Sequence, residues 1–186
     1  MTTAIGMLKI FGISTEPEDL ARKCMRTIPI EECEAAIASI TDPEQLNFII
    51  SEMGVSSYEA VLKNPHCDKA CLEAMWDRWR NEDHWDFEFL RNWARHPNVD
   101  RELSEKKRQD IATYPRYYEC YIEGRTLNDN TTKEELMEYW HVFNGAFRRY
   151  IILSKALTDE DCRRLVGRNS SDEVLVAFAE RMHLDD

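Results

Sequence analysis

The stretch NPHCDKACLEAMWDRWRNEDHWDFEFLRNWARHP, residues 64–97, decides the fold of this chain. Two similar breakers, Asn64-Pro65 and His96-Pro97, bracket it, and their prolines lie 32 residues apart. Between them, apolar residues at helical spacing predict two helices, over 68–79 and 84–95, joined by a polar turn at 80–83. In the second helix Trp85, Phe89 and Trp93 step by four residues and therefore share one face. The stretch predicts an aromatic-rich helical hairpin.

Helix start signals recur along the rest of the chain. A capping box, in which Ser or Thr is followed three residues later by Glu, satisfies two of the orphan amides at a helix start. Apolar residues at helical spacing follow each box, and no segment shows the two-residue alternation of a strand. We therefore expect an all-α fold of about nine to eleven short helices stacked as helical hairpins, with capping boxes at Thr15, Thr41, Ser56, Thr131 and Ser170.

The chain length of 186 residues fits a single all-helical domain, residues 1–186, that buries a sizeable core. A helix over 115–123 is expected to stop at Gly124, because glycine commonly ends helices. The following loop 125–131, RTLNDNT, has only Leu127 as an apolar residue. If the domain has a sub-boundary, we expect it at 125–131.

The chain is acidic, with a net charge of −11, and most of the excess lies in residues 1–93. A nucleic-acid binder normally shows a basic footprint, which this chain as a whole does not. An acidic surface is typical either of a solvated face or of docking onto a basic protein. The carboxylates that we expect to face such a partner protein are Glu31, Glu32, Glu34, Asp42, Glu44 and Glu52.

The N-terminal sequence MTTAIGMLKIFGIS has no basic leader and no small-residue cleavage site, so it does not resemble a secretory signal. No apolar run approaches the roughly 18 residues of a membrane span. These features indicate a cytoplasmic protein without a membrane anchor. In that compartment the six cysteines are expected to be reduced, mostly buried thiols.

A repeated pattern links the two breakers of the opening stretch. Residues 64–69 (NPHCDK) and 96–101 (HPNVDR) share a polar residue, proline, two further residues, aspartate and a base, and a degenerate copy lies at 168–175. The segment 94–99 resembles the helix junctions of leucine-rich-repeat-variant and other HEAT-like α-helical repeat proteins. That resemblance implies a binding scaffold of stacked hairpins. The spacing departs from the regular repeat and the later arginine of each unit is not evident, so an irregular helical bundle remains the alternative.

Candidate chemistry is sparse, and we expect no catalytic residue and no cofactor. His66, Cys67 and Cys71 form half of a zinc site at most, since no second close pair accompanies them. The pairs Glu138/His141 and Glu180/His183 have the spacing of di-iron ligands, but their helices are short. No phosphate-binding or hydrolase motif occurs. A metal-dependent enzyme using Cys/His or Glu/His ligands is thus the first alternative function.

Trp79 and Phe87 are the aromatic residues that we expect to be exposed, because charged residues flank each of them. A second alternative, nucleic-acid binding, rests on the basic run Arg101, Lys106, Lys107, Arg108 and Arg116, although interleaved carboxylates favour local ion pairing. The main hypothesis is a non-enzymatic protein–protein interaction module. It would be an acidic helical adaptor or inhibitor whose partner has a basic, possibly nucleic-acid-binding, surface.

Overall fold

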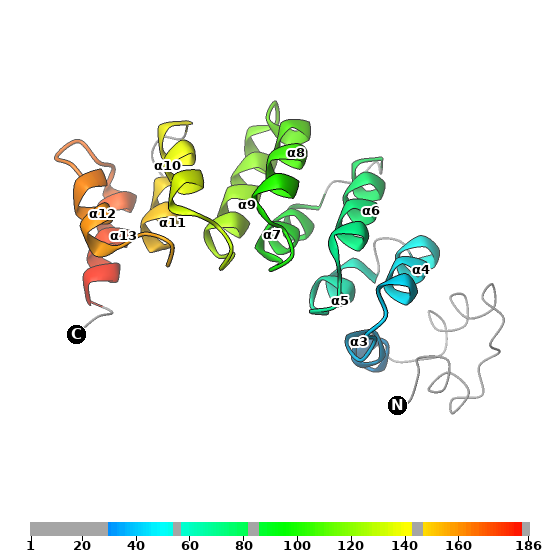
Figure 1. Cartoon of the computed structure of the whole chain (residues 1–186). Helices are drawn as coiled ribbons and strands as arrows, with labels where there is room; N and C mark the ends of the chain where they lie inside the picture. The colour runs from blue at the N-terminus through cyan, green and yellow to red at the C-terminus, as the bar shows by residue number, and fades with distance from the viewer. Residues whose placement is uncertain (1–29, 54–56, 82–85, 143–146, 184–186) are drawn as a thin grey trace. The chain divides into compact units, whose positions relative to one another are not determined.

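A computed structural model describes residues 30–53, 57–81, 86–142 and 147–183, with the side chains of residues 30–33 and 53 excepted. The described residues form eleven helices and no strand, which confirms the all-α prediction (Figure 1). Thr15 and Ser56, expected to cap helices, and Trp85, expected on the aromatic face, lie outside this part of the chain. None of the described helices has the length and apolar character needed to cross a bilayer.

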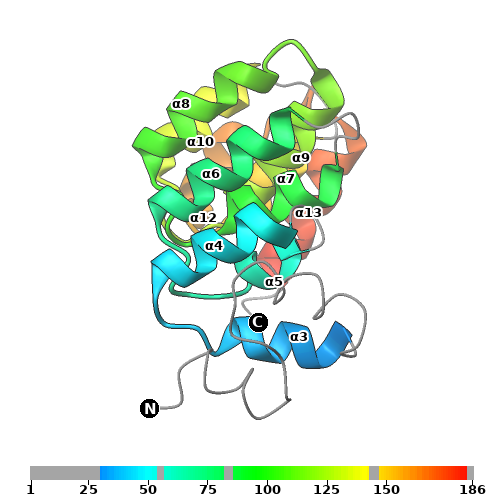
Figure 2. The ribbon, with the colours of Figure 1, turned by 90° about the vertical axis from the view of Figure 1, so that its right-hand side faces the viewer.

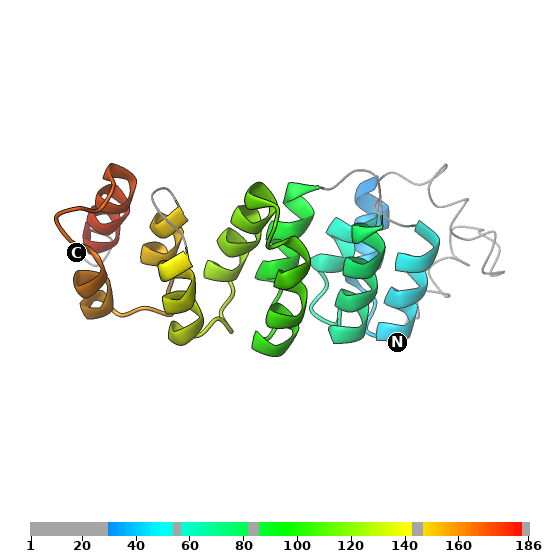
Figure 3. The same ribbon diagram turned by 90° about the horizontal axis from the view of Figure 1, so that it is seen from above.

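The chain divides into two compact units, Met1–Trp85 and Asp86–Asp186. In the first unit, α4 (Pro43–Met53) packs on α6 (Lys69–Arg80), and α3 (Ile30–Ala38) packs on α5 (Tyr58–Leu62). The views in Figures 2 and 3 show the two pairs as two layers of this unit. Leu46, Ile50, Leu72 and Trp76 are buried between them.

The second unit also has two layers. One contains α7 (Phe87–Arg95), α9 (Pro115–Thr126), α11 (Arg148–Leu153) and α13 (Asp172–His183), which pack in that order. The other contains α8 (Arg101–Ile111), α10 (Lys133–Val142) and α12 (Asp159–Leu165) (Figure 3). Residues 125–131, where a sub-boundary was predicted, lie inside this unit. The single-domain interpretation of residues 1–186 stays a prediction.

Gly124 does not end its helix, contrary to the prediction. Helix α9 continues through it to Thr126, and the glycine lies against α7. A Cβ atom on Gly124 would lie 2.3 Å from the carbonyl oxygen of Arg91 and 2.8 Å from Cβ of Ala94. The glycine is therefore required for the close crossing of α7 and α9 rather than for a left-handed cap.

Two of the predicted caps, at Thr41 and Thr131, are displaced by one residue. Asp42, not Thr41, accepts the amide of Glu44 at the start of α4. At α10 the cap is Thr132, whereas the hydroxyl of Thr131 donates to the carbonyl of Arg125. The full capping box that the described residues contain is Thr158 with Asp161, in which aspartate replaces the expected glutamate.

One five-residue turn recurs and closes the helical hairpins. Its first residue is a buried polar residue whose side chain accepts the amide of the third residue, and its fifth residue caps the next helix. Its fourth residue is buried and donates its amide to the carbonyl of the first. Copies lie at 64–68, 96–100, 128–132 and 154–158.

In the two copies found from sequence, the aspartates that cap the next helix have nearly identical backbone angles. Asp68 has φ −82° and ψ −179°, and Asp100 has φ −81° and ψ −178°. Each carboxylate accepts the amide three residues on, at 2.8 Å from Cys71 N and 3.0 Å from Leu103 N. The third and fourth copies, at 128–132 and 154–158, contain no proline and were missed. Of the predicted copy at 168–175, residues 168–171 lie between α12 and α13, and residues 172–175 form the start of α13.

The first residue of the turn also ties one hairpin to the hairpin before it. In the first unit, Nδ2 of Asn64 donates to the carbonyls of Ile37 (2.7 Å) and Ile40 (2.8 Å). In the second unit, Nδ2 of Asn128 donates to the carbonyls of Ala94 (3.0 Å) and His96 (2.7 Å). Both asparagines therefore satisfy carbonyls at the end of a preceding helix, which otherwise lack partners. This shared bonding supports the repeat interpretation of the fold.

Candidate interaction surface

Trp79 is fully buried, with 0% of its surface exposed, so the prediction that it faces a partner is wrong. It lies on the same face of α6 as Leu72, Met75 and Trp76, and its ring centroid is 5.4 Å from that of Trp76. The charged neighbours Arg78 and Arg80 point elsewhere, because adjacent residues of a helix are about 100° apart. Charged sequence neighbours therefore do not indicate an exposed helical residue.

Phe87 is exposed to 38%, as predicted. It begins α7, while Phe89 and Trp93 form the buried face of that helix. Its ring stacks on Tyr117 of α9, with centroids 4.7 Å apart and an interplanar angle of 20°. Tyr114, exposed to 46%, meets Tyr117 edge-on at 6.0 Å and 78°. The exposed Phe87 and Tyr114 and the half-buried Tyr117 form a cluster at the surface, called here the aromatic cluster.

Two exposed carboxylates flank Phe87 in sequence at the start of α7. Asp86 is the N-cap of the helix, and its Oδ1 accepts the amide of Glu88 at 2.8 Å. Glu88 lies in the first helical turn, where the helix dipole favours a negative charge. Within the described residues, neither Asp86 nor Glu88 forms an ion pair with a base. Negative charge therefore lies on both sides of Phe87 along the chain, at a helix start that is exposed.

The carboxylates predicted to face a partner lie in the first unit. Asp42, Glu44 and Glu52 are exposed and Glu34 is half-buried, whereas the side chains of Glu31 and Glu32 lie outside the described residues. None of the four described carboxylates pairs with a base within the described part of the chain. Glu52 stands in the last turn of α4, where the helix dipole disfavours a carboxylate. The last turn contains no basic residue of its own, but Nη1 of Arg78 from α6 donates to the carbonyls of Ile50 (3.0 Å) and Ser51 (2.5 Å) there.

Several arginines of the second unit are paired with local carboxylates, as the interleaved carboxylates predicted. Arg101 lies 2.8 Å from Glu138, and Arg108 lies 2.8 Å from Glu105. Arg164 pairs with Glu160 at 3.1 Å on the exposed side of α12. Lys107 of the predicted basic patch is buried. These arrangements do not provide a continuous basic face for a phosphate backbone.

The candidate metal ligands do not converge. Cys67 and Cys71 are both buried, whereas His66 is exposed, and Sγ of Cys71 donates to the carbonyl of Pro43 at 3.4 Å. The hydrogen bond that the Cys67 thiol donates to Cys71, together with burial, raises the pKa of Cys67, which keeps that thiol protonated at neutral pH. Within the described residues no three of the His, Cys, Asp and Glu side chains form a metal-binding group.

The pairs with di-iron spacing lie on separate helices. Glu138, on α10, is engaged by Arg101, while His141 is exposed at the end of the same helix. Glu180 and His183 are exposed on α13. Buried thiols at Cys67, Cys71 and Cys162 confirm the prediction for those three cysteines. Among the described residues, the candidate ligands of the zinc site and of the di-iron site therefore do not come together.

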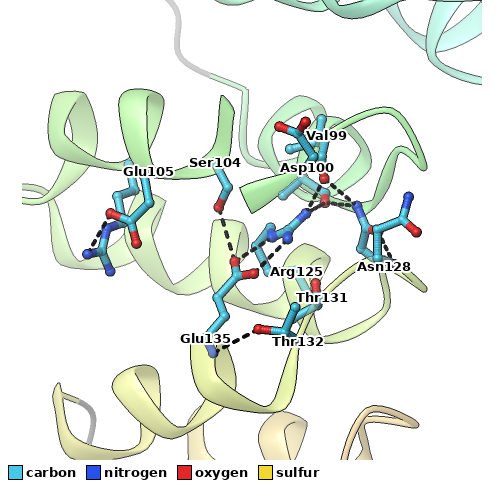
Figure 4. Close-up of polar contacts among 12 residues, drawn as sticks. Val99, Asp100, Ser104, Glu105, Arg125, Asn128, Thr131, Thr132 and Glu135 are labelled. Atoms are coloured by element: carbon cyan, nitrogen blue, oxygen red, sulfur yellow. Dashed lines mark hydrogen bonds and ion pairs between the residues drawn. The ribbon is translucent and has the colours of Figure 1, made fainter. Parts of the chain in front are cut away.

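A buried polar network joins α8, α9 and α10 in the second unit (Figure 4). Arg125 and Glu135 are 0% and 1% exposed in their side chains and form a two-pronged ion pair, with Nε–Oε1 and Nη2–Oε2 distances of 2.8 Å. Oε1 of Glu135 also accepts the hydroxyls of Tyr139 (2.6 Å) and Ser104 (3.1 Å). Ser104 and Tyr121 are within hydrogen-bonding distance at 2.6 Å.

In this network Glu135 and Arg125 are both charged, as in a structural salt bridge. Burial by itself would raise the pKa of Glu135, but the ion pair with Arg125 and the hydrogen bonds from Tyr139 and Ser104 lower it. Burial raises the pKa of both Tyr121 and Tyr139, so the phenols stay neutral donors. Glu135 is therefore a charged acceptor whose oxygens are occupied by protein donors, rather than a general base open to substrate.

Arg125 has a counterpart later in the chain, and both were missed from sequence. Nη1 of Arg125 donates to the carbonyl of Val99 at 2.6 Å, in the turn 96–100. Arg181 of α13 reaches the turn 154–158, and its Nη2 donates to the carbonyl of Leu157 at 2.5 Å. Val99 and Leu157 are both the fourth residue of their turn. The sequence signal that could have identified Arg125 is its place three residues before Asn128, the first residue of a turn.

The chain was compared with protein-family models, with characterised proteins and with solved structures, and no match was found in any of the three comparisons.

Proposed function

We propose that the protein is a non-enzymatic interaction module that binds a partner protein through that partner's basic surface. The observation that carries the proposal is the contrast between the two units. Asp42, Glu44 and Glu52 of the first unit are exposed and have no described counter-ion, whereas Arg101, Arg108 and Arg164 of the second unit are paired with local carboxylates. The molecule thus presents negative charge that remains available to a partner, and long-range attraction would steer a basic surface toward it.

The use of polar groups inside the fold supports the same proposal. Buried polar side chains such as Asn64, Asn128 and Arg125 are bonded to turn carbonyls, and Glu135 is bonded to four donor atoms. Such groups contribute to stability and are not exposed to a substrate. Stacked hairpins leave their outer faces available as binding surfaces. One form of the proposed function is an inhibitor that presents carboxylates where a partner would otherwise bind phosphates.

Affinity capture at two salt concentrations tests this function. Tagged protein would capture partners from a lysate at low and at physiological ionic strength, and the dissociation constant of each recovered partner would then be measured. We expect binding to weaken as salt screens the carboxylates, with further weakening in the variant Asp42→Asn/Glu44→Gln/Glu52→Gln. Asparagine retains the capping capacity at position 42, so the helix remains intact.

Glu59→Gln provides the matched control, because Glu59 is exposed but already pairs with Lys63 at 2.7 Å. Its neutralisation should leave partner affinity almost unchanged. If every recovered partner binds equally well at both salt concentrations and to the triple variant, the electrostatic function is wrong.

A further inference from the structure

The aromatic cluster of Phe87, Tyr114 and Tyr117 has features of a side-chain recognition site. We propose that this cluster, with the carboxylates of Asp86 and Glu88, binds an arginine side chain of the partner protein. The inference rests on the proposed function, since it names a place at which a basic partner would dock. It adds a preference for arginine over lysine, which a diffuse acidic surface does not provide.

The ring geometry leaves two differently oriented aromatic surfaces exposed. Phe87 and Tyr117 are near-parallel, at 20°, so each covers one face of the other. Tyr114 stands at 78° to Tyr117 and is 46% exposed. A planar guanidinium can stack on an exposed ring face while its edge stays in water, and it is more weakly hydrated than an ammonium group.

The charges beside the rings favour a cation. Asp86 and Glu88 flank Phe87 in sequence, and both are exposed. The cap bond to the Glu88 amide uses Oδ1 of Asp86, so its second oxygen is directed to no described partner. Arg116, which is exposed, adds one positive charge between Tyr114 and Tyr117 in sequence, so the formal charges of Asp86, Glu88 and Arg116 sum to −1. An arginine that stacks on the cluster could therefore also form an ion pair with a carboxylate.

A nucleic-acid base could stack on the same rings, but its phosphates would approach Asp86 and Glu88. Lysine satisfies the charge without the planar stacking surface. Arginine is the protein side chain that combines both properties. The expected occupant is therefore an arginine-containing segment of a protein, and binding of single-stranded nucleic acid is an alternative outcome of the test.

Peptide titration of the full chain tests the site. The probes are two peptides of equal length and charge, one alternating arginine with glycine and the other alternating lysine with glycine, and an oligonucleotide. Isothermal titration calorimetry at low salt should show tighter binding of the arginine peptide. Phe87→Leu, which removes the ring and keeps an apolar side chain, and Glu88→Gln should each weaken that binding roughly two- to five-fold.

Leu175→Ala is the control, because Leu175 is another exposed apolar residue, on α13. It should leave both peptide affinities unchanged, and circular dichroism would verify that each variant is folded. Equal binding of the two peptides, or an unchanged affinity in Phe87→Leu, overturns the arginine site. So does preferential binding of the oligonucleotide. The proposed function would survive those results if a recovered partner still bound with salt dependence and lost affinity in the triple carboxylate variant.

Discussion

Removing Arg125 should destabilise the second unit more than any single change on its surface. In Arg125→Met, Glu135 remains buried and keeps only the hydroxyl donors of Tyr139 and Ser104. The loss of one partner from a buried ion pair costs about 3–5 kcal/mol of unfolding free energy. The lost bond to the carbonyl of Val99 adds about 1 kcal/mol. The sum is a large fraction of the roughly 5–15 kcal/mol typical of a folded domain.

Hydrogen exchange read by mass spectrometry would localise this effect. Amides of α8, α9 and α10 should exchange faster in Arg125→Met, while those of α4 and α6 in the first unit should be unchanged. The matched control is Arg101→Met, because the ion pair of Arg101 with Glu138 is exposed to 48% and 43%. An exposed pair is worth at most about 1 kcal/mol, so this control should show little change.

A double-mutant cycle makes the reasoning refutable. Arg125→Met/Glu135→Leu removes both charges, and it should be less destabilised than the sum of the two single variants by about 2 kcal/mol or more. Additive losses would show that the two charges do not interact. A cost below about 1 kcal/mol for Arg125→Met would show that the pair is not buried in solution.

Other substitutions test other parts of the fold. Gly124→Ala should lose about 1–3 kcal/mol of stability in thermal unfolding, because its Cβ would meet the carbonyl of Arg91, whereas Gly167→Ala, which meets nothing within 4 Å, should not. Asn128→Asp should destabilise more than Asn128→Ala in urea unfolding, since a carboxylate would face the carbonyls that the amide now satisfies. Trp79→Ala should cost about 3–5 kcal/mol and leave the affinity of a partner for the remaining folded protein unchanged.

Acid should weaken the second unit through Glu135. Because the folded pKa of Glu135 lies below its ordinary value of 4.5, its ionisation stabilises the fold fully only above that value. The stabilisation is lost as pH falls from 4.5 through the lowered pKa. In a Glu135→Gln variant, the unfolding free energy should depend less steeply on pH in that range. An equally steep dependence in the variant would contradict this assignment.

Helix positions were predictable from sequence because periodicity reports the buried face directly. Helix α6, Lys69–Arg80, lies within one residue of the predicted range 68–79, and Asp68 and Asp100 occupy equivalent places as their alignment indicated. Cap identity was less predictable, since Thr131 and Thr132 are both competent caps and tertiary contacts decide between them. The hydroxyl of Thr131 donates to the carbonyl of Arg125 and is therefore not available to cap α10. Thr132 caps the helix instead.

The segment RTLNDNT, residues 125–131, shows why the buried polar contacts of the turns could not be predicted from sequence. Its polar composition indicated an exposed loop, yet Arg125, Asn128 and Thr131 are buried. Their partners are mainly backbone carbonyls, which every residue supplies and which leave no mark in the sequence. Leu127, the apolar residue of the segment, is instead 49% exposed. Polarity alone cannot distinguish a side chain directed to water from one directed to a turn.

The same distinction separates stability from binding in this molecule. Polar groups at the turns are already hydrogen-bonded within the fold. Their replacement should therefore lower stability without a specific effect on the affinity for a partner. Asp42, Glu44, Glu52 and Phe87 are exposed, and their replacement should lower partner affinity with little effect on stability. A substitution at Phe87 that reduced both properties equally would place its ring in the structural core. The proposed arginine site would then have no independent surface on which to act.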